Sequence, residues 1–352
     1  MKLIKYIFIL LILYIFFALG EMIASFYESN YPNASMNTQH LFKYVCKNNR
    51  TKFIPDVKII NDIKSRFKND LPKINSFINE EFSYYKQNTD SDSQKILDLV
   101  MGSILVSLNC DPFHYSGSKI QGRIHDEFKK ELPSIKNKYK VYMYVPEVFW
   151  SHHGLRNENQ KILDYIKERD ILDIGAFCGD SLIVLLPYTD KIVYSYEYSP
   201  SNVKLIQKAI KENKLDENRI RLYNKGIGNE TKTIKTSFKR ALQSQINNNE
   251  HGYEVNITTI DNECKKLNIK VGFMKADIEG MELQALQGAV ETIKMQRPII
   301  SFSIYHNFNG LFKVRHFLDQ FPNYAFKYKI GSHYHYSFGE LIIFAYPKEL
   351  SI

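Results

Sequence analysis

The stretch Ile171-Leu-Asp-Ile-Gly-Ala-Phe-Cys-Gly-Asp-Ser181 predicts a buried strand, a glycine turn and the start of a helix. Its apolar beginning suits a parallel strand that is covered on both faces. Gly175 and Gly179 bracket a turn in which main chain passes close to a neighbour. Asp180 and Ser181 can accept hydrogen bonds from the free N–H groups of the helix. Together these features form a cradle for a nucleoside-like or anionic ligand.

A second stretch, Ile192-Val-Tyr-Ser-Tyr-Glu197, supplies the companion of this turn. It reads as an apolar strand that ends in a carboxylate, eighteen residues beyond Gly179. An acid at the end of the second strand can accept hydrogen bonds from both hydroxyls of a ribose. Ser199 and Pro200 then predict the N-cap and first position of the next helix.

A third stretch, Val271-Gly-Phe-Met-Lys-Ala-Asp-Ile-Glu-Gly-Met-Glu282, again predicts a strand, a glycine turn and a helix. Period-two alternation places Lys275, Asp277 and Glu279 on one side of the strand end. With Glu282, three carboxylates gather at the carboxyl edge of the sheet, where ligands bind in open α/β folds. Burying several acids is costly without partners, and Lys275 could neutralise part of the cluster.

The chain from Asp170 onward alternates strands and helices, which predicts a parallel sheet with helices on both faces. Asp261 is expected to cap the helix that follows it. Upstream, residues 141–150 are rich in β-forming types, and a turn over 151–155 carries His152 and His153. The other expected elements are strands over 220–226, 255–260, 299–305, 324–329 and 340–345, a helix over 160–167, and a polar excursion over 229–256.

The N-terminal segment, residues 1–25, is separable from the fold. Lys2 and Lys5 precede an apolar run from Tyr6 to Gly20, which is typical of a single-pass membrane anchor or of a cleaved signal peptide. The anchor predicts a membrane protein whose orientation stays open, with a secreted or cytoplasmic chain as the alternative. Residues 38–140 are expected to form a helical extension, and residues 141–347 the main domain.

Charge and cysteine content exclude some classes of protein. The 352 residues carry a formal net charge of +9, but no single basic face is visible, so no nucleic-acid partner is expected. The four cysteines, Cys46, Cys110, Cys178 and Cys264, lack metal-ligand spacing, and no metal is predicted. A disulfide between Cys46 and Cys110 remains possible in an oxidising compartment. Nothing in the sequence indicates the oligomeric state.

Four motifs resemble those of the FkbM family, which belongs to the class I S-adenosylmethionine-dependent methyltransferases. They are Val145-Pro-Glu-Val-Phe-Trp-Ser-His-His-Gly-Leu155, Asp173-Ile-Gly-Ala-Phe-Cys-Gly-Asp-Ser181, Lys275-Ala-Asp-Ile-Glu-Gly-Met-Glu282 with Gly288-Ala289, and Ser303-Ile-Tyr-His306. The likeness runs from about Val141 to Pro347, and the run beginning at Lys275 is its most specific part.

The resemblance implies a Rossmann-like, seven-stranded sheet with an antiparallel last strand and S-adenosylmethionine over the ends of its first two strands. It implies that the turn holds the methionine moiety, that Glu197 holds the ribose, and that Tyr198 or the loop at Gly226 holds the adenine. Asp277 would approach the sulfonium or the substrate. The residues implied for the methionine moiety are Asp173, Gly175, Phe177, Gly179 and Asp180.

The resemblance further implies O-methylation of a sugar or another hydroxyl, on a small molecule or a glycan. A hydroxyl acceptor must lose its proton, so a base is expected, and His306, Asp277 and His153 are the candidates in that order. Three alternatives stay open. One is a metal-dependent enzyme that uses Asp277, Glu279 and Glu282 as ligands. Another is a nicotinamide enzyme, although the glycine spacing departs from that of dinucleotide folds. The third is a membrane-tethered binding module without methyl-transfer activity.

Overall fold

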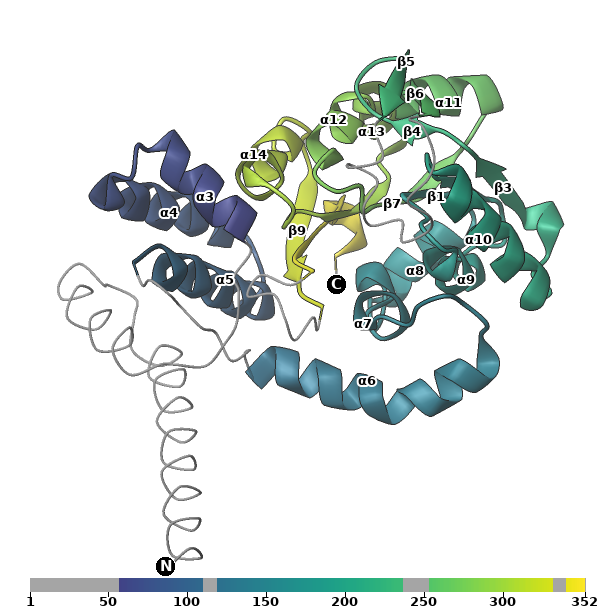
Figure 1. The fold of residues 1–352 in the computed structure, drawn as a ribbon, viewed down its shortest axis with the longest axis horizontal. Coiled ribbons are helices and arrows are strands. Elements are labelled where there is room, and N and C mark those ends of the chain that lie inside the picture. Colours follow the sequence, from purple (N-terminus) through teal and green to yellow (C-terminus); the bar gives the residue numbers. More distant parts are fainter. Residues whose placement is uncertain (1–56, 110–118, 237–252, 332–339, 352) are drawn as a thin grey trace, which may run out of the picture.

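The computed structural model describes residues 57–109, 119–236, 253–331 and 340–351 (Figure 1). The predicted N-terminal anchor and both cysteines of the possible disulfide lie outside these ranges. No helix within them is both long and apolar enough to cross a membrane.

A seven-stranded sheet forms the centre of the molecule, in the order β3-β2-β1-β7-β8-β10-β9. Neighbours from β3 to β8 are parallel, while β10 runs antiparallel to both β8 and β9. The predicted antiparallel last strand is therefore confirmed. The chain order reverses between β1 and β7, which is where open α/β sheets bind ligands. The strands are β1 (Asp170–Ile174), β2 (Val193–Tyr196), β3 (Ile220–Tyr223), β7 (Val271–Ala276), β8 (Ile299–Ser303), β9 (Tyr324–Lys329) and β10 (Ile342–Pro347).

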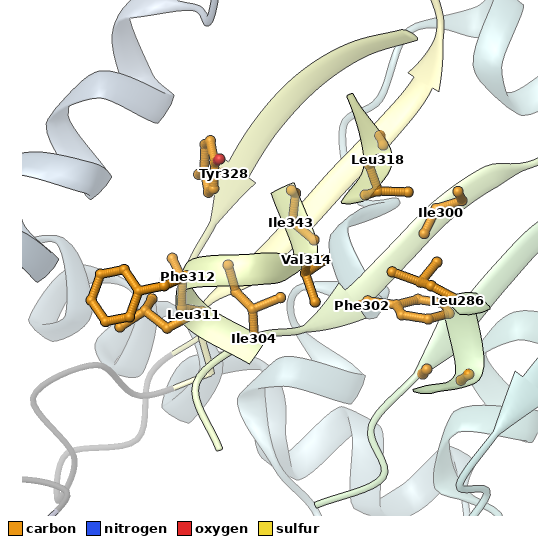
Figure 2. Close-up of a cluster of buried hydrophobic side chains, with 14 of the residues drawn as sticks. Leu286, Ile300, Phe302, Ile304, Leu311, Phe312, Val314, Leu318, Tyr328 and Ile343 are labelled. Atoms are coloured by element: carbon orange, nitrogen blue, oxygen red, sulfur yellow. The ribbon is translucent and has the colours of Figure 1, made fainter. Parts of the chain in front are cut away.

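Helices cover both faces of this sheet. On one face the buried cluster includes Ile162, Leu182 and Ile206. The other face packs around Leu286, Phe302 and Leu311, three of the buried side chains that Figure 2 labels. The helices are α8 (Gln160–Lys167), α9 (Asp180–Leu185), α10 (Pro200–Glu212), α11 (Ile260–Leu267), α12 (Glu282–Gln287), α13 (Val290–Gln296) and α14 (Phe308–Leu318), with short 3₁₀ turns η2 (Leu186–Tyr188), η3 (Glu217–Arg219) and η5 (Lys348–Leu350).

A small second sheet lies beside α11, in the order β4-β6-β5. Its strands are β4 (Gly226–Ile227), β5 (Lys232–Thr236) and β6 (Tyr253–Thr258). The sequence predicted only a polar excursion where β5 lies, because its lysines and threonines carry no apolar stripe. Pairing with β6 supplies the hydrogen bonds that make it a strand.

The helical extension packs closely against the sheet. Its helices are α3 (Val57–Arg66), α4 (Leu71–Lys86), α5 (Ser91–Asn109) and α6 (Lys119–Lys138). In Figure 1 the first three lie beside α14 and β9, and α5 contacts β9 directly. The Ser93 hydroxyl accepts the backbone N–H of Tyr328 at 2.8 Å, and the Tyr85 hydroxyl donates to the Leu311 carbonyl at 2.9 Å. The extension thereby covers the outer strand, whose free edge would otherwise invite aggregation.

Two local predictions were wrong. The β-rich stretch 141–150 contains the helix α7 (Pro146–Phe149), followed by the 3₁₀ turn η1 (His152–Gly154). Proline suits the first helical position, because its φ is already fixed near the helical value and its missing N–H would have no partner there. All four residues of α7 are buried, and this burial overrides their β propensity. The second error concerns Asp261. Thr259 caps α11, whereas the Asp261 carboxylate accepts N–H groups of α13.

Candidate active site

The glycine turn after β1 is shaped by close packing against the end of β7. Gly175 has φ 78°, and a Cβ on it would lie 2.1 Å from the carbonyl oxygen of Asp277. Gly179 has φ 85°, and a Cβ there would lie 3.2 Å from the Cα of Ile206 in α10. Both positions favour glycine through their left-handed backbone as well as through lack of space. Gly175 thus brings the loops after β1 and β7 into contact, and Gly179 lets the turn pack against α10.

Asp173, near the end of β1, holds this turn through hydrogen bonds and an ion pair. Both of its carboxylate oxygens accept the Ser181 hydroxyl at 2.9 Å, and Ser195 donates to it at 3.3 Å. The Lys275 ammonium lies 3.4 Å from it and donates to the Gly175 carbonyl at 2.7 Å. Burial would lower the pKa of Lys275, but the surrounding carboxylates, Asp173 first, outweigh burial and raise it. Asp173 is fully buried and fixes the turn from within, rather than lying on the surface of the cradle.

The residues predicted to hold the ribose and the adenine do come together. Glu197 accepts the N–H of Phe177 at 2.9 Å through one oxygen and that of Ser199 at 2.8 Å through the other. It therefore links the turn after β1 to the end of β2. Burial raises the pKa of Glu197 to about 7. Tyr198 is 38% exposed and lies against Gly226 of β4.

Asp180 lies at the other end of the turn. It is buried, begins α9 and accepts the N–H of Ser181 at 2.9 Å. Burial raises the pKa of its carboxyl group, and the nearby Lys275 ammonium partly opposes this. Phe177, between the two glycines, also has a left-handed backbone, with φ 44°. The turn thus places its own backbone and the carboxyl group of Asp180 at the carboxyl edge of the sheet.

The acidic edge of the sheet is built around His306. Its Nε2 lies 3.2 Å from Asp277 and its Nδ1 lies 3.0 Å from Glu282. Burial would lower the pKa of His306, but these two carboxylates raise it well above its ordinary value. The ring is therefore a cation that donates through both nitrogens. Such a ring has no lone pair with which to accept a proton, which argues against the first predicted base.

Asp277 and Glu282 differ in their surroundings. Burial would raise the pKa of Asp277, but the hydrogen bond from His306 lowers it to about 2. Its side chain keeps 23% of its surface exposed, so it is the member of the trio that faces outward. Glu282 is fully buried and also accepts the N–H groups of Ile278 at 3.0 Å and Gly280 at 3.3 Å.

The same trio offers the atoms of a possible metal site. One atom from each of Asp277, Glu282 and His306 lies within 4.8 Å of the others. The two ring nitrogens, however, point to opposite sides of the imidazole, each toward its own carboxylate. The geometry is that of an imidazolium bridge between two acids. Glu279, the third acid of the predicted metal alternative, is 54% exposed and lies 3.8 Å from His306.

Sequence reasoning missed one buried acid, Glu147 of α7. Burial, followed by the charge of Asp277, raises its pKa to about 8. The Ser303 hydroxyl of β8 donates to it at 3.3 Å, and Nδ1 of His153 lies 3.6 Å away. A lone glutamate within the apolar run Val145-Pro-Glu-Val-Phe149 was the available signal.

The two adjacent histidines face different surroundings. His153 is buried beside Glu147, and burial lowers the pKa of its ring to about 4. His152 instead hydrogen-bonds the Tyr188 hydroxyl through Nδ1 at 2.6 Å. Only His153 therefore belongs to the site.

Residues 173–328 match the family model described as the methyltransferase FkbM domain. This stretch, somewhat less than half of the chain, is therefore similar to the FkbM methyltransferase domain. The match begins at the buried Asp173 and includes the Lys275–Glu282 run and His306. The FkbM domain thus contains both the glycine turn and the acidic edge. Glu147 and His153 lie upstream of the matched residues.

The fold is shared with one solved structure, and a second shows a weaker likeness. The methyltransferase FkbM from Methylobacillus flagellatus KT is 20% identical, with a TM-score of 0.51 over 76% of this chain and 58% of that one. This chain therefore spans less than two thirds of that protein. The O-methyltransferase TomG from Streptomyces achromogenes, in complex with SAM, is 12% identical with a TM-score of 0.37, covering 66% and 90% of the two chains. A comparison with curated proteins finds no match.

Proposed function

We propose that this protein transfers a methyl group from S-adenosylmethionine to a hydroxyl of a sugar or another small acceptor. The observation that carries the proposal is the Glu197 carboxylate. It links the turn after β1 to the end of β2, on one side of the switch point between β1 and β7. The sequence between these two points carries no dinucleotide glycine pattern, which disfavours a nicotinamide enzyme.

The residues of the cradle fit such a cofactor by their chemistry. Each Glu197 oxygen accepts one backbone N–H and keeps capacity for a hydroxyl, which suits the two hydroxyls of a ribose. Tyr198 and Gly226 lie next to it and offer a flat contact for a base. Asp277 supplies an ionised, partly exposed carboxylate at the neighbouring strand end, which suits a ligand that carries positive charge.

The cofactor supplies an electrophilic methyl group on a positively charged sulfur. The chain's own task is to align the acceptor with that methyl group and to remove the acceptor's proton. Alignment alone can contribute about 7 to 11 kcal/mol to lowering the barrier. The rigid contact between the loops after β1 and β7 suits this task, because it fixes the distance between the cradle and the acidic edge.

Calorimetric titration of the full chain with S-adenosylmethionine and with S-adenosylhomocysteine tests the proposal. We expect Glu197→Gln to weaken binding about 10- to 100-fold, the effect of losing a hydrogen bond to a charged group. Glu168→Gln, at an exposed end of α8, serves as the matched control and should bind as the wild type does. A folded wild type that binds neither ligand would refute the proposal.

The remaining alternatives separate in the same preparation. A membrane-tethered binding module would bind its ligand without producing a methylated hydroxyl compound, detected as a mass increase of one methyl group. A metal-dependent enzyme would lose activity on chelation with EDTA. We expect activity to survive EDTA, because His306 is held as a cation between Asp277 and Glu282.

A further inference from the structure

We propose that His153 removes the proton of the acceptor hydroxyl through Nε2, and that Glu147 orients its ring. The assignment rests on the methyltransferase function proposed above and specifies its base. It draws on residues of α7 and η1 that lie outside the matched FkbM domain.

The ring of His153 carries a buried nitrogen without a hydrogen-bond partner among the described residues. His153 is 2% exposed, and its Nε2 has no hydrogen-bond partner among the described residues. Buried polar atoms are nearly always satisfied, so such a nitrogen calls for an explanation. The charges that act on the ring are those of Lys275, Asp173, Asp180 and Asp277, which line the cradle and the acidic edge. The ring therefore lies within electrostatic reach of both the cofactor cradle and the acidic edge.

The backbone that carries the ring has an unfavourable conformation. His152 and His153 both have φ 51°, a left-handed conformation that is uncommon outside glycine. The Ser301 hydroxyl of β8 donates a hydrogen bond to the His153 carbonyl at 2.6 Å, and the Lys329 ammonium of β9 donates to the Gly154 carbonyl. Two strands of the sheet thus fix an unfavourable turn. Strain of this kind persists where surrounding structure enforces it, and it concentrates at functional sites.

The other ring nitrogen of His153, Nδ1, faces the carboxyl group of Glu147. Glu147 Oε1 lies 3.6 Å from it and accepts the Ser303 hydroxyl at 3.3 Å. The separation is longer than a hydrogen bond, but catalytic hydrogen bonds are often long before the ligand is bound. A carboxylate that accepts from Nδ1–H leaves the lone pair on Nε2. With an acceptor hydroxyl at Nε2, this order of acid and imidazole would be the one that general-base catalysis uses.

The other two candidates are poorer bases. The two carboxylate partners of His306 raise the pKa of its ring and favour the protonated form, which has no free lone pair. Asp277 has a pKa of about 2, so its carboxylate holds a proton only weakly. Efficiency in general-base catalysis falls as the basicity of the group falls. Burial lowers the pKa of His153 to about 4, which still lies above that of Asp277, and its neutral ring keeps Nε2 free.

The acceptor O–H bond breaks, and its proton bonds to the lone pair of His153 Nε2. The oxygen electron pair forms the new bond to the methyl carbon of the sulfonium donor. The bond from that carbon to sulfur breaks with both electrons passing to sulfur, which becomes a neutral thioether. The imidazolium of His153 returns the proton to water after product release.

Glu147 makes this step pH-dependent. Its pKa is raised to about 8 by burial and by Asp277, while Lys275 and His306 act in the opposite direction. Below that pH its carboxyl carries a proton, donates toward Nδ1 of His153 and places the ring hydrogen on Nε2. Above that pH the carboxylate accepts from Nδ1–H and Nε2 becomes a base. The rate should therefore rise as pH increases through about 8.

Three full-length variants test the assignment. His153→Asn keeps a residue that tolerates the left-handed backbone but removes the base. Glu147→Gln keeps shape and removes the charge. His152→Asn is the matched control, because it alters the neighbouring left-handed residue, whose ring contacts Tyr188 instead. We expect kcat to fall about 100-fold or more in His153→Asn. Cofactor Kd should change little, and the control should keep its rate.

A second readout needs no substrate. Ring nitrogen chemical shifts of His153 should switch from the Nε2–H to the Nδ1–H tautomer with a midpoint near pH 8, and the switch should vanish in Glu147→Gln. An active His153→Asn variant, or a cofactor Kd that rises in step with the loss of kcat, would overturn the assignment alone. A wild type that fails to bind S-adenosylmethionine would overturn the proposed function and this assignment with it.

Discussion

The charge at His306 decides how the acidic edge is held together. Asp277, Glu282 and the imidazolium form a chain in which one cation separates two acids. Without it, the fully buried Glu282 would keep its two backbone N–H bonds but lose its counter-charge. Removing one partner of a buried ion pair commonly costs about 3 to 5 kcal/mol. The primary role of His306 in this structure is thus to hold Asp277 in place as a carboxylate.

His306→Gln is expected to lower the free energy of unfolding by about 3 kcal/mol. Adding Glu282→Gln should restore part of that loss, because the second change removes the unpaired charge. Urea denaturation at pH 7 measures both. Additive losses in the double variant would contradict the ionic explanation. The folded pKa of His306 lies above its unfolded value, so its contribution is complete below about pH 6.5 and is lost as pH rises through the folded pKa.

At the scale of elements, Asp261 joins two helices that are separate in sequence. It lies in the first turn of α11, yet its carboxylate accepts the N–H groups of Glu291 at 3.1 Å and Thr292 at 2.8 Å, and the Thr292 hydroxyl at 2.7 Å. The residue before α13, Ala289, has no side chain that can cap. Asp261 therefore supplies the cap of α13 from outside that helix.

Asp261→Ala should destabilise the protein by about 1 to 2 kcal/mol, as loss of an N-cap does. Asp190→Ala is the control, since that carboxylate is 58% exposed and lies 3.8 Å from its lysine partner. Chemical unfolding measures the difference. If the cap instead served only α11, Thr259→Ala would account for the whole effect and Asp261→Ala would match the control.

The contrast between these elements explains what sequence could predict. The helix α8 and the start of α10 were predicted correctly because their signals are local: Asn159 and Ser199 cap their own helices. The strand, turn and helix around Gly175 were predicted for the same reason, because they are contiguous in sequence. The roles of Asp261 and Glu147 were not predicted, because their hydrogen-bond partners, Thr292 and Ser303, lie far away in sequence.

For the whole molecule, the question is whether the helical extension and the sheet form one cooperative unit. Phe82 and Tyr85 of α4 are fully buried, and Phe82 meets Phe312 of α14 edge-on at 6.3 Å. Tyr84 donates to Asp319, and Glu81 pairs with His316 at 2.8 Å. Their core is continuous with that of the sheet. We therefore expect α3–α5 to unfold together with the main domain, although sequence composition separates them.

Phe82→Ala tests this expectation. Loss of a fully buried phenylalanine commonly costs about 3 to 5 kcal/mol. Trp150 is the only tryptophan and lies directly after α7, where its indole N–H donates to Glu127 of α6. Its fluorescence therefore reports on the main domain together with α6, whereas far-UV circular dichroism also includes α3–α5. If the unit is cooperative, both signals shift to lower denaturant together, and the control Met295→Ala, 79% exposed, moves neither. A helical signal that is lost first, with the Trp150 midpoint unchanged, would instead establish two independent domains, because the extension would then melt without disturbing the sheet.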